Sequence, residues 1–329
     1  MATAQHPAVL TPAQPTRESP QLNRNTHQDR RSAPSVPPAL RRGAIAGVLV
    51  FGFAAVLILT PGPSQVQASG LFGGLRAPGE PSFIAGHRGD RAAAPENTMP
   101  ALQAALDGPM GFVETDIQLT ADRVPVLIHD TFVDRTTNGS GRVDEFTFRQ
   151  LQQLDAGAWF SPEFAGTRIP TLESLLSALQ ATEQRGVQKK ALLELKGYWS
   201  AAEAKIVLDL IAQYGVRQQV ILSSFDTSTL QHIEEVDADL PRAIIAASLP
   251  KDPVGFAKLY GAIAIITSQA SVLADPWSVD RMHRAGLGII LYTLNTRSRW
   301  KEAMDLGVDG IITDRPNRLD HWFASALSP

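Results

Sequence analysis

The sequence has 329 residues, of which 44% are hydrophobic and 19% are charged, so it contains enough apolar material for a folded core. It has no cysteine, which excludes disulfide bonds, thiolate metal sites and a cysteine nucleophile. The net charge of −3 is unevenly distributed: residues 1–42 contain six arginines and two acidic residues, whereas residues 43–329 contain 24 basic and 31 acidic residues. A mildly acidic body gives no electrostatic reason to expect binding to nucleic acid.

An uncharged apolar run of eighteen residues occupies positions 43–60, directly after Arg41 and Arg42. That length is close to what a helix needs to cross a bilayer, and arginines before the run predict that the bulk of the chain is extracytoplasmic. The small residues at 66–68 are typical of a signal cleavage site. The sequence is therefore compatible with two forms. One is a secreted protein whose signal is cleaved, and the other is a membrane-anchored protein that retains the helix.

The composition divides the chain into four parts. The first part is rich in Pro, Ser, Gln and Arg, so we expect a disordered basic cytoplasmic lead. A transmembrane helix or signal segment, a linker that contains Gly and Pro, and a folded domain follow it. The expected boundaries of the four parts are 1–42, 43–60, 61–81 and 82–329.

Short apolar runs alternate with amphipathic stretches in the folded domain. The apolar runs predict eight strands, at 83–87, 112–117, 191–195, 220–223, 242–247, 262–266, 288–292 and 310–313. Helical periodicity predicts helices that include 99–107, 171–183, 201–214, 278–285 and 299–306. This alternation is typical of a parallel sheet buried on both faces, and eight units favour a closed (β/α)8 TIM barrel of the α/β class. Residues 130–170 interrupt the alternation and are expected to form a small insertion after the second strand.

Polar residues occur where several predicted strands end, which is the end of such a barrel that carries the chemistry. Glu114 and Asp116 are two residues apart in the second strand, so both project to the same face, and Glu194 ends the third strand. Converging carboxylates repel one another unless a cation lies among them, and oxygen ligands suit Ca²⁺ or Mg²⁺. We predict a divalent metal site here, with solvated or salt-bridged carboxylates as the alternative.

Two histidines accompany these carboxylates. His87 ends the first predicted strand and His129 follows an apolar run, and either alone is compatible with a buried structural histidine. Together, two imidazoles beside a phosphoryl group can move one proton in and one proton out near neutral pH. Arg88 and Lys196 can neutralise phosphate oxygens, with structural ion pairing as the alternative. Glu96 precedes a predicted helix, so a helix-capping carboxylate is its alternative role.

A series of motifs resembles the glycerophosphodiester phosphodiesterase family, and the match extends over about residues 82–320. The motifs are HRG at 87–89, APENT at 94–98, ETD at 114–116, PVLIHD at 125–130, RTTNGSG at 135–141, LDAG at 154–157, IPTL at 169–172, LELK at 193–196 and GVDGIITDRP at 307–316. Tyr292 stands where family members often have tryptophan, so an aromatic wall is kept while the preference for the alcohol is open to change.

The resemblance implies a (β/α)8 barrel and metal-dependent hydrolysis of glycerophosphodiesters to glycerol 3-phosphate and an alcohol. It also implies that the neighbouring glycerol hydroxyl attacks phosphorus before water opens a cyclic phosphate. The metal ligands that it implies are Glu114, Asp116 and Glu194. The implied acid/base pair is His87 and His129. The implied substrate contacts are Arg88, Glu96, Lys196 and Tyr292.

Two alternatives remain at the level of sequence. One keeps catalysis but moves it to lysophospholipids or polymeric phosphodiesters, in a reaction like that of a phospholipase D. The other is a noncatalytic surface protein that binds phosphodiesters. In each case the expected partner is a small-molecule phosphodiester, with the membrane as a further partner if the segment at 43–60 is retained.

Overall fold

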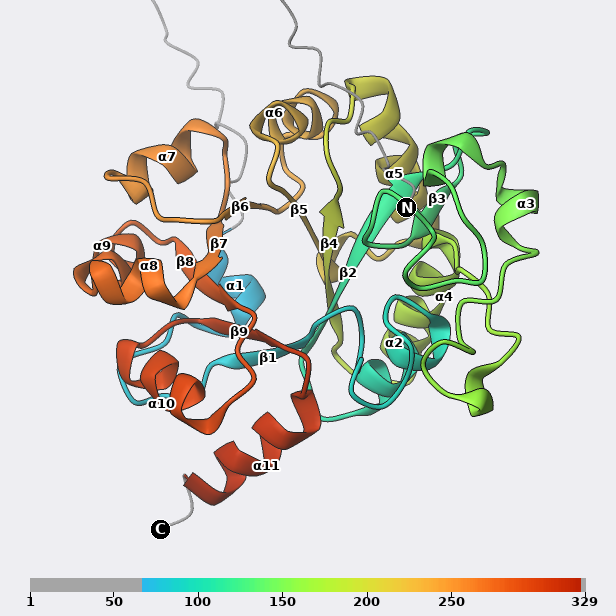
Figure 1. Cartoon of the computed structure of the whole chain (residues 1–329). Coiled ribbons are helices and arrows are strands. Elements are labelled where there is room, and N and C mark those ends of the chain that lie inside the picture. Colours follow the sequence, from blue (N-terminus) through green and yellow to red (C-terminus); the bar gives the residue numbers. More distant parts are fainter. Residues whose placement is uncertain (1–66, 327–329) are drawn as a thin grey trace, which may run out of the picture. The chain divides into compact units, whose positions relative to one another are not determined.

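The structure, a computed structural model, describes residues 67–326. Within that range eight parallel strands pair side by side, and the first strand pairs with both the second and the last, so the sheet closes into a barrel (Figure 1). The strands are β1 (Phe83–Gly86), β2 (Phe112–Leu119), β4 (Lys190–Leu195), β5 (Val220–Ser224), β6 (Arg242–Ala246), β7 (Ala264–Ser268), β8 (Gly288–Tyr292) and β9 (Gly310–Thr313). The predicted barrel is confirmed, and each predicted strand corresponds to one of these.

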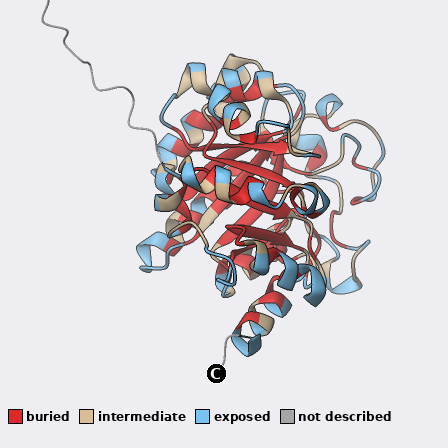
Figure 2. Ribbon diagram, turned by 90° about the vertical axis from the view of Figure 1, so that its left-hand side faces the viewer, coloured by how far each residue is buried: buried red, intermediate tan, exposed pale blue. Residues whose placement is uncertain are grey.

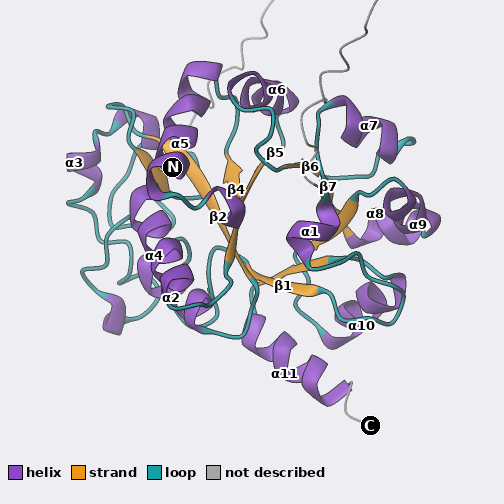
Figure 3. Cartoon of the chain, turned by 180° about the vertical axis from the view of Figure 1, so that it is seen from behind, coloured by secondary structure: helices purple, strands orange, loops and turns teal. Residues whose placement is uncertain are grey.

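Helices surround the barrel on its outer side (Figure 3). They are α2 (Met99–Asp107), α4 (Leu172–Gln184), α5 (Ala201–Tyr214), α6 (Thr227–Val236), α7 (Pro253–Leu259), α8 (Gln269–Ala274), α9 (Trp277–Arg284), α10 (Arg297–Leu306) and α11 (Pro316–Ala326). The strands are buried, whereas the helices expose their outer faces (Figure 2). The five helices predicted from periodicity are α2, α4, α5, α9 and α10, each within two residues of its predicted bounds.

Alternate residues of each strand serve two separate cores, because successive side chains in a strand point to opposite faces. In β9, for example, Ile311 packs outward in the core shared with the helices, whereas Ile312 packs inside the barrel. In β5, Leu222 packs in the outer core and Ile221 packs inside the barrel. Both faces are apolar, which explains the nearly continuous apolar runs in the sequence.

The insertion expected after the second strand lies between β2 and α4. It contains β3 (Pro125–Leu127), which pairs antiparallel with the end of β2, the short helix α3 (Phe148–Leu151) and 3-10 turns at Val143–Glu145 and Pro162–Phe164. The segment has a small apolar core of its own, to which Val126, Val133, Val143, Leu151 and Ile169 belong. This core holds the insertion as an ordered unit beside β2.

A short helix, α1 (Ala68–Phe72), lies within the ring of strands when the barrel is viewed from either end (Figures 1 and 3). Phe72 contacts Phe83 and Phe112, with ring centroids 5.0 and 6.2 Å apart. Gly288 leaves room for these rings, because a side-chain carbon there would collide with Phe72. Phe83 and Phe112 begin β1 and β2, so α1 closes the N-terminal end of the barrel.

The position of α1 differs from the expectation that residues 61–81 form a linker. Leu71 and Phe72 are buried in the interior core, so α1 packs against the barrel, whereas residues 77–81 are exposed. The sequence of α1 is too short to show a helical period, which is why composition alone indicated a linker.

Among residues 67–326, no helix has the length and apolar character needed to span a membrane. The apolar segment predicted at 43–60 and the basic lead at 1–42 lie outside the residues that the structure describes.

Candidate active site

The barrel interior changes from apolar to charged along its axis. Near the C-terminal ends of the strands it opens into a cavity of about 210 Å³. Eight of the nine predicted site residues line this cavity, and Glu96 does not. The lining residues are His87, Arg88, Glu114, Asp116, His129, Glu194, Lys196, Ser223, Phe225, Ile245, Ile266, Tyr292, Thr293 and Ile312.

Three carboxylates meet on one side of the cavity. Glu114 and Asp116 follow Phe112 on the interior face of β2, and Glu194 lies beside Asp116 in the register of β2 and β4. One carboxylate oxygen from each of the three lies within 4.8 Å of the others. All three side chains are buried.

Of the three carboxylates, only Glu114 forms no ion pair with a cationic side chain among the described residues; Asp116 and Glu194 each form at least one. Burial raises the pKa of Glu114 well above its usual value, and Asp116 and Glu194 raise it further. Glu114 accepts a hydrogen bond from the backbone N–H of Arg88, at 2.8 Å, but none of the described side chains forms an ion pair with it. Burial and Asp116 also raise the pKa of Glu194 to about 7. Three convergent oxygen donors with an unneutralised member fit a hard divalent cation such as Ca²⁺ or Mg²⁺.

Two cationic side chains flank the carboxylates without balancing all of them. Lys196 Nζ lies 2.7 Å from Glu194 Oε1 and 3.5 Å from Asp116 Oδ1. Arg88 Nε lies 3.3 Å from Asp116 Oδ2. Burial would raise the pKa of Asp116, but Lys196 and Arg88 outweigh it and the pKa is lowered. Asp116 is therefore the member of the cluster that is most readily ionised.

Asn97 holds Asp116 in place. Its amide Nδ2 donates to Asp116 Oδ2 at 2.9 Å, and its Oδ1 accepts from the hydroxyl of Thr115 at 2.6 Å. Asn97 has a positive φ of 55°, a backbone conformation that asparagine tolerates better than most residues. This residue was not predicted as part of the site, although it lies within the APENT motif.

Each histidine is paired with a carboxylate through Nδ1. His87 Nδ1 lies 2.6 Å from Asp314 Oδ1, and His129 Nδ1 lies 2.7 Å from Asp130 Oδ1. Asp314 is held in turn by Asn295, whose Nδ2 donates to Oδ2 at 2.7 Å. Such a pairing selects the tautomer and orientation of the ring and leaves Nε2 for chemistry. Burial lowers the pKa of His129, although Asp116 and Asp130 oppose this effect.

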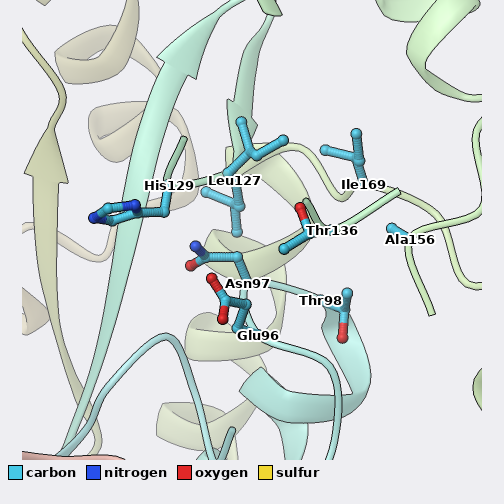
Figure 4. A pocket seen from close by; sticks show the side chains of 9 residues that line it. Glu96, Asn97, Thr98, Leu127, His129, Thr136, Ala156 and Ile169 are labelled. Carbon is cyan, nitrogen blue, oxygen red and sulfur yellow. The ribbon is translucent and has the colours of Figure 1, made fainter. Parts of the chain in front are cut away.

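Glu96 lies behind the cavity rather than on its surface. Figure 4 shows its carboxylate beside Asn97, below His129, in a hollow of about 10 Å³ that is no larger than one water molecule. Its oxygens contact Arg88, Arg91 and Arg135. Glu96 therefore does not line the cavity itself, although it contacts Arg88, which does.

The opposite side of the cavity is apolar and aromatic. Tyr292 ends β8 and meets Phe225 edge to face, with ring centroids 6.2 Å apart. Ile245, Ile266 and Ile312 complete this side. The cavity thus combines a charged half and an apolar half, as expected for a site that binds a charged group attached to a carbon skeleton.

Sequence reasoning missed the carboxylate partners of the histidines. Asp130 follows His129 directly, so its role was accessible from the sequence. Asp314 directly follows the last strand and lies 227 positions from His87, so only the closure of the barrel brings the two together. No sequence pattern indicated that Arg91 and Arg135 contact Glu96.

Comparison with known proteins gives a consistent result. The family model described as glycerophosphoryl diester phosphodiesterase family matches residues 87–318. YhdW of Bacillus subtilis (strain 168) is 35% identical over 240 residues, which cover 71% of this chain and 95% of the relative. A glycerophosphodiester phosphodiesterase of Caldanaerobacter subterraneus subsp. tengcongensis is 31% identical over 239 residues, covering 72% of this chain and 96% of the relative.

Solved structures agree with these relatives. A glycerophosphodiester phosphodiesterase from Agrobacterium tumefaciens str. C58 has 29% sequence identity and a TM-score of 0.64, with 73% of this chain and 99% of that chain covered. An Oleispira antarctica phosphodiesterase in complex with the product sn-glycerol-3-phosphate has 25% identity and a TM-score of 0.68, with 74% and 96% covered. The chain described here belongs to the glycerophosphoryl diester phosphodiesterase family and is an enzyme that hydrolyses phosphodiesters.

Proposed function

We propose that this enzyme cleaves glycerophosphodiesters to glycerol 3-phosphate and an alcohol, with a divalent cation on the carboxylate cluster and the two histidines as acid/base pair. One observation carries the proposal: a single cavity is lined by the three buried carboxylates and by both carboxylate-paired histidines. The product bound by the Oleispira antarctica neighbour is the one expected from this reaction.

Glu114, Asp116 and Glu194 would hold the cation. When bound, Ca²⁺ or Mg²⁺ would polarise a phosphoryl oxygen and offset the negative charge that develops on it. Asn97 keeps Asp116 aimed into the cluster through the 2.9 Å hydrogen bond from its amide. Lys196 stays within reach of both Asp116 and Glu194, so it lies at the edge of the same site.

The histidines would move protons between the reacting oxygens. In the first step one imidazole Nε2 accepts the proton of the glycerol hydroxyl next to the phosphate as that oxygen bonds to phosphorus. The other imidazole donates a proton to the alcohol oxygen as its bond to phosphorus breaks. In the second step a water oxygen bonds to phosphorus and gives a proton to the imidazole that acted as acid in the first step. The other imidazole returns its proton to the glycerol oxygen as the bond between that oxygen and phosphorus breaks. Intramolecular attack gains effective concentration, and a suitably placed acid and base each accelerate such steps.

Arg88 and Lys196 would contact the nonbridging phosphate oxygens, because both line the cavity next to the carboxylates. Tyr292 and Phe225 would border the carbon skeleton of the substrate. No described feature of the site favours a noncatalytic binding protein, since every predicted catalytic and metal residue lines the same cavity.

The decisive experiment measures release of glycerol 3-phosphate from glycerophosphocholine by the full chain, with Mg²⁺ or Ca²⁺ added after chelation. His87→Gln and His129→Gln are each expected to lower kcat by about 10²–10⁴-fold. His321→Gln is the matched control, because His321 lies on α11 and is exposed. Turnover that survives either catalytic substitution would contradict the assignment.

The same assay compares headgroups. Phe225 lines the cavity and is half exposed, so this wall of the site is open to solvent, and alcohols larger than choline or ethanolamine belong in the comparison. A panel that includes lysophospholipid and a glycerophosphate polymer tests whether either is turned over faster than the small diesters.

We also propose an extracytoplasmic location, secreted or membrane-anchored. Its support is the apolar segment at 43–60 with arginines before it. Fractionation of cells, followed by N-terminal sequencing of the exported protein, tests the location and distinguishes a cleaved signal from a retained anchor. Recovery of the active enzyme in the cytoplasm alone would contradict this proposal.

A further inference from the structure

Glu96 is buried, charged and outside the proposed chemistry. Its side chain is 2% exposed, and its two oxygens contact three guanidinium groups. Arg88 Nη1 lies at 2.5 Å, Arg91 Nη2 at 2.7 Å, and Arg135 makes a forked contact at 2.7 and 3.1 Å. Burial alone would raise the pKa of Glu96, but the arginines hold it at about 2. A helix cap needs no such set of partners, because caps interact with backbone N–H groups.

One branch of these contacts leads to His87. Arg91 binds Glu96 through Nη2, and its Nη1 lies 3.6 Å from Asp314 Oδ1. The same Oδ1 atom lies 2.6 Å from His87 Nδ1. Arg91 therefore stands between Glu96 and the carboxylate that orients His87.

A second branch leads to His129. Arg135 belongs to the insertion, and while two of its nitrogens contact Glu96 its Nε donates to Asp130 Oδ2 at 2.5 Å. The other oxygen of Asp130 lies 2.7 Å from His129 Nδ1. One arginine thus links the Asp130–His129 pair of the insertion to Glu96 in the loop after β1.

We propose that Glu96 is a positioning residue that orients both histidine–carboxylate pairs at once, through Arg91 on one side and Arg135 on the other. The proposal rests on the proposed function insofar as the histidines are catalytic. A third contact, to Arg88, links the same carboxylate to the guanidinium beside Asp116. One buried charge thereby connects the loop after β1, the end of β9 and the insertion, which are distant in sequence.

The test compares Glu96→Gln with wild type in the full chain, by kinetics and by proton NMR of the imidazole Nδ1–H signals. A hydrogen bond to a carboxylate slows exchange of this proton with water, so the signal reports the orientation of each ring. Assignment of the signals comes from His87→Gln and His129→Gln. We expect both signals to broaden or disappear in Glu96→Gln, and kcat to fall by about 10–100-fold with less than about a threefold change in KM.

Single-branch variants sharpen the test. Arg91→Met is expected to affect the His87 signal alone, and Arg135→Met the His129 signal alone. Both side chains are partly exposed, at 28% and 44%, so their loss is tolerated better than that of a core residue. Asp237→Asn is the matched control, because it breaks a carboxylate–arginine pair with Arg217 that lies outside the cavity.

Three results would overturn the proposal. A raised KM with unchanged kcat would make Glu96 a substrate contact. A lower melting temperature with unchanged imidazole signals would make it merely structural. If Arg91→Met or Arg135→Met alone changed both imidazole signals, the two histidines would not be oriented through separate arginines. If instead His87→Gln and His129→Gln stay active, the proposed function fails, and the imidazole signals still decide the role of Glu96.

Discussion

Asp116 and Glu194 are direct partners in the register of two neighbouring parallel strands. Their carboxylates, with that of Glu114 two residues away, come within 4.8 Å of one another without help from a loop. A shift of one residue in either strand would turn its carboxylate to the outer face. The candidate metal site is therefore built into the sheet, which is the most rigid part of the barrel.

Replacement of Asp116 should weaken cation binding while the protein still folds. Asp116→Asn keeps the shape of the side chain but removes the most readily ionised ligand, so we expect affinity for Mg²⁺ or Ca²⁺ to fall by at least about 10-fold. Isothermal titration calorimetry of the chelated protein measures this change. Asp209→Asn, which breaks an exposed pair with Lys205, should leave the affinity unchanged. Equal affinity in wild type and Asp116→Asn would place the cation elsewhere.

The raised pKa of Glu194 predicts a pH dependence of stability in the metal-free protein. A carboxyl whose pKa is about 7 when folded and 4.5 when unfolded favours the folded state below pH 4.5, and this contribution is lost as the pH rises to 7. Glutamine does not ionise, so the stability of Glu194→Gln relative to wild type should increase over that interval by about 1–3 kcal/mol. Denaturant unfolding at pH 5 and pH 8 measures the difference, and a decrease would contradict the raised pKa.

Tyr292 should influence which alcohol leaves. Tyr292→Ala removes one partner of the aromatic pair with Phe225 while leaving the histidines and carboxylates in place. We expect KM to rise by about 10-fold with a smaller effect on kcat, because the lost contact binds ground state and transition state alike. Tyr292→Trp, with a larger ring, should retain activity but change the ratio of kcat/KM between choline and ethanolamine diesters. Identical ratios in all three proteins would show that Tyr292 takes no part in selection.

The contact between α1 and the barrel makes a prediction about folding. Phe72 is buried against Phe83 and Phe112, so Phe72→Ala should lower the free energy of unfolding by about 3–5 kcal/mol. The catalytic cavity lies at the other end of the strands, and kcat of the folded variant should stay within about twofold of wild type. Leu259→Ala, at a residue that is 67% exposed, is the control and should cost little. An unchanged free energy of unfolding in Phe72→Ala would show that the packing of α1 does not stabilise the barrel.

The strands were predictable because each is a short apolar run in which both faces are buried. The bounds of β8 and β9 match the prediction, and those of the other six strands differ from it by one or two residues, which is usual at strand ends. Helices α6, α7, α8 and α11 were not predicted: α7 and α8 are seven and six residues long, and Thr227–Val236 begins with three polar residues. Their positions depend on packing against the barrel more than on their own pattern.

The site was predictable as far as local motifs reach. His87, Glu114 and Asp116 lie in or directly after strands, and the barrel topology alone brings such positions together. Glu96 was placed with the substrate contacts because its motif lies next to the site, yet its partners Arg91 and Arg135 draw it behind the cavity. Contacts between side chains on separate loops leave no periodicity in a sequence, so this part of the site required the three-dimensional structure.

Because α1 and its phenylalanine neighbours seal one end, the barrel is a cup and not a tunnel. Both products must then leave through the entrance by which the substrate arrived. A chain of linked phosphodiesters has no route to thread past the histidines, so it can present only a terminus or a bend at the rim.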